Sequence, residues 1–258
     1  MPVKWFDGIK VGYRKGKNPL KKGKPTLVMI HGAGANSEFW SSQLACLGNE
    51  MNAVALDLPG HGQSGGSSCD SIPGYAQWVY TVVDQWFTDP VYLMGHSMGG
   101  AIVQEVAIQH PHRFQGFILV GTGAMLKVTP LFLEGLSQDF EKTIDTIASY
   151  GYSKITDRQL VRDGARIMKK PGPAAVLNDF VACDRFDRRK AVENISSPCL
   201  IICGADDKLT PRDFSTFLQE KITGSRLKII EKAGHMVMIE QPKAVNAAIQ
   251  KFINEESR

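Results

Sequence analysis

The chain has 258 residues, of which 43% are hydrophobic and 22% are charged, and its formal net charge is +4. This is the composition of an ordinary globular protein with one large domain, and it excludes a disordered, collagen-like or coiled-coil chain. No apolar run approaches the roughly 18 residues that a membrane-spanning helix needs, and the first residues lack the pattern of a secretory signal, so we expect neither a membrane span nor export.

The cysteines and the absence of metal motifs indicate a reducing compartment and no metal centre. The five cysteines are odd in number and form no Cys-x-x-Cys pair, which argues against a disulfide framework or a zinc site and favours a cytoplasmic protein. No His-Glu-x-x-His zinc motif and no Walker phosphate-binding loop occurs in the sequence. We therefore expect neither a metal nor another cofactor.

Residues 14–24 form a basic run with six basic side chains and no acidic one, so that the rest of the chain carries a net charge of about −2. Such a run is typical either of an anion-binding patch or of a solvated turn between two strands. We favour the turn, because the run holds two glycines and a proline but no aromatic side chain that would stack on bases. We therefore expect no nucleic-acid partner.

Apolar strands alternate with helices along most of the chain. In chain order, the predicted elements are strands 3–6, 9–14 and 26–30, a helix 37–47, a strand 51–57, a helix 73–87, a strand 91–95, a helix 98–110, strands 114–120 and 199–203, a helix 211–219, a strand 226–231 and a helix 242–254. This alternation indicates an α/β protein with a mostly parallel sheet and helices on both of its faces.

Residues 124–195 interrupt the alternation, because they contain helix signals and no convincing strand. Pro130 suits the first turn of a helix, Asp157 and Asp187 suit helix N-termini, and residues 171–173 form a Pro-Gly-Pro breaker. We therefore predict three or four short helices inserted into one α/β domain. The predicted organisation is a core of residues 1–123 and 196–258 and a helical cap of residues 124–195.

The first candidate site is Gly95-His96-Ser97-Met98-Gly99, a Gly-x-Ser-x-Gly sequence between a predicted strand and a predicted helix. This is the setting of a nucleophile elbow, in which the glycines leave room for neighbouring backbone and the serine projects above the sheet edge. The Met98 amide at the helix start can then face a developing oxyanion. The alternative is a glycine-rich turn in which Ser97 caps the helix, and the partners described next favour the nucleophile.

His235 is the best candidate among the six histidines for the base that a serine nucleophile needs. It follows the last predicted strand, at the sheet edge where ligands bind in parallel α/β folds. We expect His31 and His61, which lie in glycine-rich loops, to be structural. The side chain of His96 should point away from Ser97, because the turn between them is sharp.

Two adjacent aspartates, Asp206 and Asp207, follow the penultimate predicted strand at the same edge of the sheet. One carboxylate there should hold the tautomer of His235 and stabilise its charged form. The other is then a turn or helix N-terminal residue, and the spacing alone leaves open which is which.

The chain order of serine, aspartate and histidine is that of the α/β-hydrolase triad. Over residues 25–123 and 197–255 the sequence resembles the α/β-hydrolase superfamily, and within it the cap-bearing serine esterases and lipases. His31-Gly-Ala-Gly34 resembles the oxyanion loop of that family, and Gly95 to Gly100 matches the elbow of monoacylglycerol-lipase-like members. Asp57 begins a further turn that resembles the family, where this aspartate is mostly structural.

The resemblance implies roles for individual residues. In the family the acid stands three residues after the glycine that ends its strand, which is Asp207 when counted from Gly204. The second oxyanion amide, beside that of Met98, belongs to the residue after His-Gly, which is Ala33. Because Ser97 stands where haloalkane dehalogenases and epoxide hydrolases have aspartate, the resemblance disfavours those activities.

The implied activity is hydrolysis of carboxylic esters of short to medium acyl chain through an acyl-enzyme intermediate. The partner would be a small-molecule ester, and either a monomer or a homodimer is compatible with the sequence. Two alternatives stay open: a carbon–carbon bond hydrolase that acts on a vinylogous diketone with the same triad, and a ligand receptor that keeps the triad but turns over slowly.

Four large apolar residues are candidates for the substrate pocket. Phe39 and Trp40 follow the predicted oxyanion loop, while Met125 and Met236 flank the predicted catalytic loops. Such side chains suit an apolar acyl pocket, since methionine adapts to varied shapes. The alternative for each of them is an ordinary place in the hydrophobic core.

Overall fold

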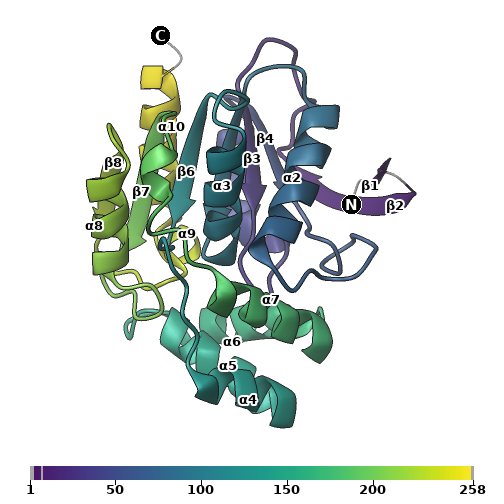
Figure 1. Ribbon diagram of the computed structural model, residues 1–258, viewed down its shortest axis with the longest axis vertical. Helices are drawn as coiled ribbons and strands as arrows, with labels where there is room; N and C mark the ends of the chain where they lie inside the picture. The colour runs from purple at the N-terminus through teal and green to yellow at the C-terminus, as the bar shows by residue number, and fades with distance from the viewer. Residues whose placement is uncertain (1–2, 7, 257–258) are drawn as a thin grey trace.

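An eight-stranded sheet with the order β1-β2-β4-β3-β5-β6-β7-β8 forms the centre of the molecule (Figure 1). The computed structural model describes residues 3–6 and 8–256. The strands are β1 (Val3–Phe6), β2 (Ile9–Lys15), β3 (Thr26–Ile30), β4 (Asn52–Leu56), β5 (Val91–His96), β6 (Gly116–Val120), β7 (Cys199–Gly204) and β8 (Arg226–Ile230). In the order of the sheet, all neighbouring strands from β4 through β3 to β8 are parallel. In contrast, β1 pairs with β2, and β2 with β4, in antiparallel fashion.

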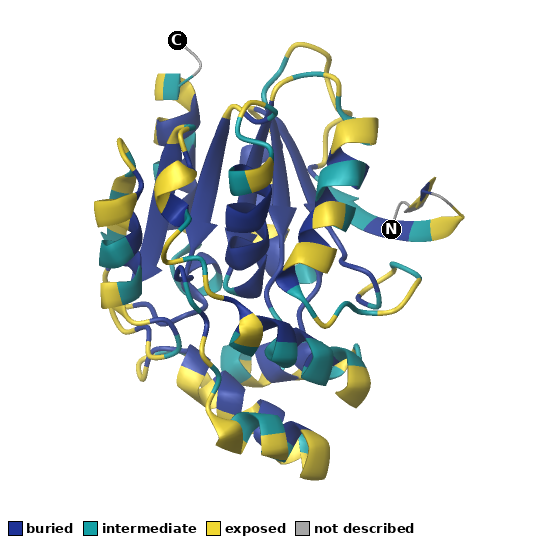
Figure 2. Cartoon of the chain, viewed as in Figure 1, coloured by how far each residue is buried: buried dark blue, intermediate teal, exposed yellow. Residues whose placement is uncertain are grey.

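Helices cover both faces of the sheet, as the apolar strands require. Along β3, Val28 and Ile30 pack in one hydrophobic cluster, while Leu27 and Met29 pack in the other, because successive side chains of a strand point to opposite faces. Helices α2 (Ile72–Trp86), α3 (Met98–Gln109) and α8 (Arg212–Lys221) cover the first face, and α1 (Ser41–Leu47) and α10 (Pro242–Glu256) cover the second. The strands β3 to β7 are buried, β2 and β8 are partly exposed, and the outer sides of the helices are exposed (Figure 2).

The cap consists of four helices that lie together beyond the carboxyl ends of the central strands (Figure 1). They are α4 (Pro130–Gln138), α5 (Phe140–Gly151), α6 (Arg158–Lys169) and α7 (Pro173–Arg185). Pro130 and Pro173 stand at the first position of their helices, and the Asp157 side chain caps α6 by accepting a hydrogen bond from the amide of Gln159.

Three local expectations need correction. The predicted helix 37–47 is a 3₁₀ turn, η1 (Ser37–Trp40), followed by α1. No helix begins at Asp187; instead this residue forms an isolated bridge with Met125 and its carboxylate accepts hydrogen bonds from Arg189. Two short helices were not predicted, η2 (Val192–Asn194) and α9 (Val237–Glu240).

The basic residues 14–24 begin at the end of β2 and continue into the loop that leads to β3, as a turn between two strands would. Within the part of the chain that the structure describes, no helix is both long enough and apolar enough to cross a membrane.

Candidate active site

Ser97 lies at a sharp turn between β5 and α3. Its backbone has φ 54° and ψ −116°, a conformation that costs a residue with a side chain roughly 1–3 kcal/mol. The turn is held because the Ser97 amide donates to the carbonyl of Val120 at 2.9 Å and the Thr122 hydroxyl donates to the carbonyl of Ser97 at 2.9 Å. A side chain at Gly95 would collide with the carbonyl group of Gly99, so this turn requires glycine there. The Ser97 side chain makes no capping hydrogen bond to α3, which leaves its hydroxyl available for chemistry.

His235 and Asp207 form a buried pair, with His235 Nδ1 2.9 Å from Asp207 Oδ2. The carboxylate also accepts hydrogen bonds from the amides of Leu209 and Thr210 through Oδ1 and from the Thr210 hydroxyl through Oδ2. Because Nδ1–H of His235 donates a hydrogen bond to Asp207, the imidazole is held in the tautomer whose Nε2 can accept a proton.

The environment of Asp207 favours its charged form. Burial alone would disfavour the charge, but the nearby His235 and the hydrogen bonds from His235 and Thr210 outweigh burial and hold the pKa of this carboxyl below its ordinary value. The hydroxyl of Thr210, which also lies 3.1 Å from His235 Nδ1, was not singled out from the sequence. The sequence feature that could have identified Thr210 is its position three residues after Asp207, from which its side chain can turn back onto the carboxylate.

Asp206 has a different set of contacts. Its side chain is exposed and accepts a hydrogen bond from the Ser153 hydroxyl of the cap at 2.5 Å. Its amide donates to the carbonyl of Ala233 at 2.8 Å. Of the two adjacent aspartates, only Asp207 therefore contacts the imidazole of His235, while Asp206 connects the core to the cap.

The side chain of His96, which was expected to point away from Ser97, lies against the other predicted catalytic residue, His235, and lines the cavity. Its ring packs against that of His235, with 4.6 Å between centroids, and Nε2 lies 3.0 Å from the backbone carbonyl oxygen of His235. Burial, with a smaller contribution from the neighbouring His235, lowers the pKa of His96 to about 3. His96 is therefore neutral at ordinary pH and uses its single N–H to hold the backbone of His235.

The loop that contains Ala33 is held by the ring of His31. The amide of Leu58 donates to His31 Nε2 at 3.0 Å, so the ring proton is on Nδ1, which lies 2.8 Å from the carbonyl oxygen of Gly32. That carbonyl and the Ala33 N–H belong to one planar peptide group and point in opposite directions, so the ring also sets the direction of the N–H. Burial, and next the neighbouring His61, lowers the pKa of His31 to about 3, which keeps it neutral.

The amides of Ala33 and Met98 are the two expected oxyanion donors. Ala33 and Ser97 line the same cavity, and Met98 is the first residue of α3, where a helix leaves its amides without an intrahelical acceptor. Among the residues that the structure describes, neither amide has a hydrogen-bond acceptor. The side chain of Met98 itself is buried in the core.

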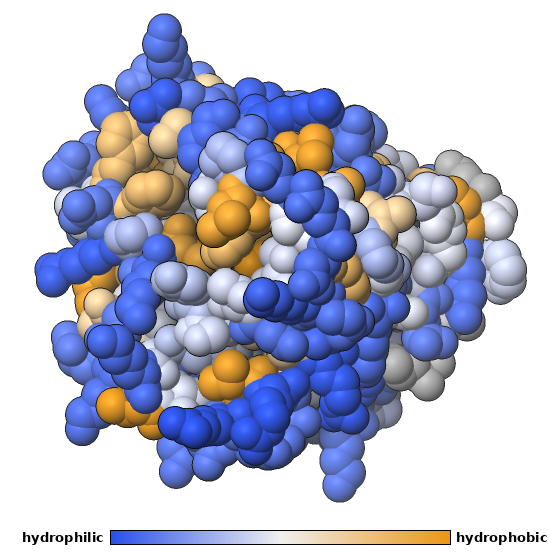
Figure 3. Space-filling view, turned by 90° about the horizontal axis from the view of Figure 1, so that it is seen from below, coloured by the Kyte–Doolittle hydropathy of each residue, from blue (hydrophilic) through white to orange (hydrophobic). Residues whose placement is uncertain are grey.

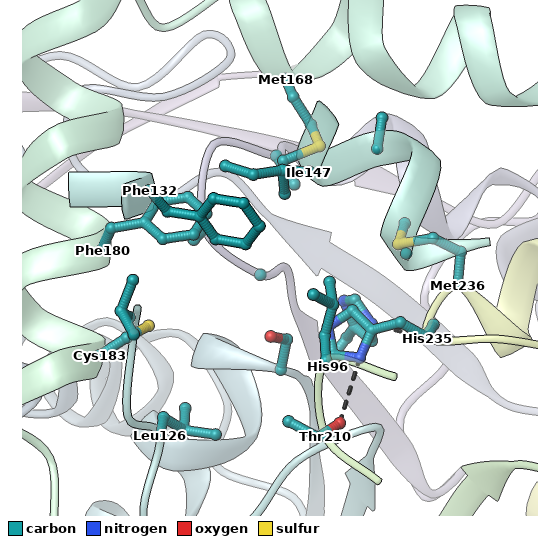
Figure 4. A pocket seen from close by; sticks show the side chains of 18 of the residues that line it. His96, Leu126, Phe132, Ile147, Met168, Phe180, Cys183, Thr210, His235 and Met236 are labelled. Carbon is teal, nitrogen blue, oxygen red and sulfur yellow. Dashed lines mark hydrogen bonds between the residues drawn. The ribbon is translucent and has the colours of Figure 1, made fainter. Parts of the chain in front are cut away.

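A cavity of about 270 Å³ lies between the core and the cap. The core contributes Ala33, Phe39, His96, Ser97, Thr210, His235 and Met236 to its lining. The cap contributes Leu126, Phe132, Ile147, Met168, Phe180 and Cys183. Figure 4 shows apolar cap residues such as Phe132, Ile147 and Met168 on the side opposite His96, His235 and Thr210. Ser97 and His235 thus open on the same apolar space.

Two of the four predicted pocket residues line this cavity and two do not. Phe39 and Met236 are part of the lining, whereas Trp40 is fully buried in the core. Met125 also lies outside the lining, and the next residue, Leu126, takes its place because neighbouring residues of an extended segment point to opposite sides. The cap side chains of the lining were missed, since no local pattern marks which face of a cap helix meets the core.

Glu240 of α9 joins the loop of His235 to the cap. Its Oε1 accepts from the amide of Gly234 at 2.8 Å, and its Oε2 accepts from the amide of Ser153 at 2.8 Å and the hydroxyl of Thr156 at 2.5 Å. The position of the loop that carries His235 therefore depends on the cap. Within the described ranges 3–6 and 8–256, no cluster of His, Cys, Asp or Glu side chains could hold a metal ion.

Known proteins share this fold and sequence pattern. A family model described as the alpha/beta hydrolase family matches residues 27–248. A Klebsiella pneumoniae relative named pimeloyl-[acyl-carrier protein] methyl ester esterase is 30% identical over 243 residues, or 87% of this chain and 92% of the relative. A relative of the same name from Aeromonas hydrophila is 27% identical and aligns over 89% of this chain and 95% of its own. A solved structure described as a thermophilic esterase has a TM-score of 0.86 and 31% identity, and the match covers 99% of this chain and 97% of that one.

The chain therefore belongs to the alpha/beta hydrolase family. It is an enzyme, a hydrolase of the carboxylesterase type. The fold class and the family expected from the sequence are confirmed.

Proposed function

We propose that this protein hydrolyses carboxylic esters of short to medium acyl chain through an acyl-enzyme intermediate, with Ser97, His235 and Asp207 as its catalytic residues. The observation that supports the proposal most directly is the buried pair of His235 and Asp207, which opens on the same cavity as the strained Ser97. A pair of this kind activates a serine when the second imidazole nitrogen is available to it.

In the first half of the reaction the Ser97 hydroxyl attacks the ester carbonyl carbon while His235 Nε2 takes the hydroxyl proton. The carbonyl oxygen becomes an oxyanion that accepts hydrogen bonds from the amides of Ala33 and Met98, each of which contributes roughly 3–4 kcal/mol in comparable sites. The intermediate then expels the alcohol, which takes the proton from His235 and leaves the acyl group on the serine oxygen.

In the second half a water molecule attacks the acyl carbon, and His235 takes its proton. The same two amides stabilise the second oxyanion. When it collapses, the bond to the serine oxygen breaks, the serine recovers its proton from His235 and the carboxylic acid leaves. Throughout, Asp207 orients the imidazole and stabilises its positive charge.

The cavity supports the expected substrate size. At about 270 Å³ it is slightly smaller than the roughly 300–1,000 Å³ that is common for pockets of drug-sized ligands, and its walls are mostly apolar. On the face seen from the cap side, hydrophobic patches lie among hydrophilic residues (Figure 3). By their names, the relatives are esterases of the methyl ester of pimeloyl-[acyl-carrier protein], which supports ester hydrolysis and adds a carrier-bound acyl group to the substrates to be tested.

A reducing cytoplasm is the proposed location. The structure leaves the five cysteines unpaired, and three of them, Cys183, Cys199 and Cys203, are buried. Burial raises the pKa of the Cys203 thiol to about 11 and that of Cys199 to about 12, which keeps both protonated and unreactive.

The experiment is a panel of p-nitrophenyl esters of increasing acyl length, assayed with the wild type and Ser97→Ala. We expect the highest kcat/KM for short to medium chains, loss of nearly all turnover in Ser97→Ala with an unchanged melting temperature, and labelling of the wild type alone by a fluorophosphonate. Turnover that persists in Ser97→Ala would overturn the assignment of the nucleophile.

Two further assays test the alternatives. Faster cleavage of a coloured vinylogous diketone than of any ester would favour a carbon–carbon bond hydrolase. Turnover far below about 1 s⁻¹ on every ester, together with ligand-dependent binding of a partner protein, would favour a receptor.

A further inference from the structure

Asp179, a fully buried carboxylate of cap helix α7, reaches into the core and takes part in three hydrogen bonds. Its Oδ2 accepts from the backbone amide of Gly34 at 2.8 Å and lies 2.8 Å from His61 Nε2. Its Oδ1 accepts from the hydroxyl of Tyr75 at 2.5 Å. The three partners come from the oxyanion loop, a core turn and α2, so one cap side chain connects three separate stretches of the core.

The second partner, His61, is held in its charged form. Both ring nitrogens face acceptors, because Nδ1 lies 2.9 Å from the carbonyl oxygen of Pro59 and Nε2 faces Asp179. A histidine that donates from both nitrogens carries a positive charge. Burial would lower the pKa of His61, but the carboxylate of Asp179 and the hydrogen bond to it outweigh burial and raise the pKa. The charge of Asp179 is thus balanced without any contribution from the cavity.

The first partner, Gly34, follows Ala33 directly in the chain. The peptide before Ala33 is held by His31, through the carbonyl of Gly32, and the peptide after it is held by Asp179, through the amide of Gly34. The cap also lies against this turn, since a side chain at Gly34 would meet Val176 of α7 at 3.4 Å. The core therefore fixes one side of Ala33 and the cap fixes the other.

We propose that Asp179 is a positioning residue for the oxyanion loop, so that the Ala33 amide is correctly aimed only while cap helix α7 is docked on the core. The inference rests on the proposed function, because it gives that reaction's oxyanion donor a support in the cap. In catalysis the donor must meet the oxyanion at hydrogen-bond distance, and a displacement of about 1 Å costs up to about a hundredfold in rate. Without the hydrogen bond from Gly34 to Asp179, the peptide group after Ala33 is no longer held in place. We therefore expect kcat to fall more than the affinity for the substrate.

The test compares two variants of Asp179 with a neighbour on the same helix. Asp179→Ala removes the acceptor, and we expect kcat to fall about 10- to 100-fold with KM within about twofold of the wild type. Asp179→Asn keeps one acceptor oxygen for the Gly34 amide, so it should retain several times more activity than Asp179→Ala. The matched control is Asn178→Ala, which removes a different link between cap and core, the hydrogen bond to the Ser68 hydroxyl, without touching the oxyanion loop.

A second readout reports on the oxyanion itself. A trifluoromethyl ketone forms a tetrahedral adduct with an active-site serine, and its affinity should fall in parallel with kcat in the Asp179 variants. The affinity of the product carboxylate should change by less than about twofold, because it forms no tetrahedral oxyanion. If Asp179→Ala does not fold, Asp179→Asn carries the test, with an expected loss of about three- to tenfold in kcat and in ketone affinity.

Three outcomes would overturn the inference: unchanged kcat in both Asp179 variants, an effect confined to KM, or an equal loss of kcat in Asn178→Ala. The last would show that cap docking in general, rather than the Gly34 contact, sets the rate. These failures differ from failure of the proposed function, in which the wild type itself would neither hydrolyse esters nor react with the fluorophosphonate.

Discussion

The part of the chain that the structure describes contains two buried histidine–aspartate pairs with nearly the same nitrogen–oxygen distance. His235 Nδ1 lies 2.9 Å from Asp207, and His61 Nε2 lies 2.8 Å from Asp179. Each pair has a second histidine packed against the first, His96 at 4.6 Å and His31 at 5.1 Å between ring centroids, and the pKa of each second histidine is lowered to about 3.

The two pairs differ in what the remaining nitrogen of the paired histidine meets. The other nitrogen of His61 faces the carbonyl of Pro59, and the side chain is fully enclosed. The other nitrogen of His235 has no hydrogen-bond partner among the described residues, and His235 lines the cavity. A histidine–aspartate pair therefore identifies a candidate base only when its second nitrogen is unoccupied and accessible. A fully occupied pair holds the structure together.

The largest expected effect is a loss of activity when the histidine of the cavity-facing pair, His235, is replaced. His235→Gln removes the base, so kcat/KM on the preferred p-nitrophenyl ester should fall about a thousandfold or more, while the free energy of unfolding should fall by only about 1–3 kcal/mol, because Asp207 keeps its hydrogen bonds from Leu209 and Thr210. Steady-state kinetics and urea denaturation of the same preparation measure both quantities. A loss of less than about tenfold would show that another group supplies the base.

The matching substitution in the fully enclosed pair of His61 and Asp179 should act mainly on stability. His61→Gln leaves the charge of Asp179 buried without its counter-charge, which costs about 3–5 kcal/mol in the free energy of unfolding. Urea denaturation at pH 7 measures this cost. If His61→Gln were as stable as the wild type, the ion pair described for His61 and Asp179 would be incorrect.

Acid should destabilise the fold through the second histidine of each pair. His31 and His96 stay neutral in the folded state down to about pH 3, whereas the unfolded chain protonates them below about 6.5, so the unfolded state binds more protons and stability falls as the pH decreases. His61, with its raised pKa, acts in the opposite direction, because its contribution is present at low pH and is lost as the pH rises through that raised value. From pH 7 to pH 5 the net loss should be about 2–4 kcal/mol.

Urea denaturation at the two pH values measures this loss, and His96→Asn provides the comparison. Removing one of the two neutral histidines should reduce the acid-induced loss by about 2 kcal/mol. A loss that is the same in His96→Asn and the wild type would contradict the low pKa of His96.

The smallest expected effect comes from the hydrogen bond that Thr210 donates to Asp207 of the catalytic pair. Thr210→Val removes the hydroxyl that donates to Asp207 Oδ2, so Asp207 loses one of its hydrogen bonds. At about 1 kcal/mol for such a bond, kcat/KM should fall about fivefold. Thr210→Ser, which keeps the hydroxyl, should remain within about twofold of the wild type, and an equal loss in both variants would show that the hydrogen bond from the hydroxyl is not what sets the rate.

The sequence alone predicted those features that depend on short stretches of chain. The turn at Ser97 follows from a strand, a Gly-x-Ser-x-Gly pattern and a helix, all within about 20 residues. The carboxyl ends of parallel strands meet at one edge of a sheet, which places His235 and the two adjacent aspartates together, whereas the choice of Asp207 over Asp206 came from the family resemblance. These local rules led to the fold class, to the family and to the two residues that the structure brings together in the cavity.

The features that were missed depend on contacts between distant segments. The charge of His61 requires Asp179, which is 118 residues away and belongs to the cap, and nothing near His61 indicates that partner. The cavity wall formed by Phe132 and Phe180 depends on how the cap helices dock. The assignment of Trp40 failed for a related reason, since adjacent Phe39 and Trp40 are both large and aromatic, and only the fold decides which of them faces the cavity.

Glu240 accepts three hydrogen bonds that link the cap to the core loop that carries His235. In a chimaera with an exchanged cap, these two segments would come from different parent proteins. A foreign cap that lacks the Thr156 hydroxyl, or whose backbone does not bring the amide of position 153 to Glu240, would leave Oε2 of this carboxylate without a hydrogen bond beside the segment that carries His235. Exchange of caps between relatives, a natural way to redesign selectivity, should therefore succeed only when the junction residues and Glu240 are transferred as one set.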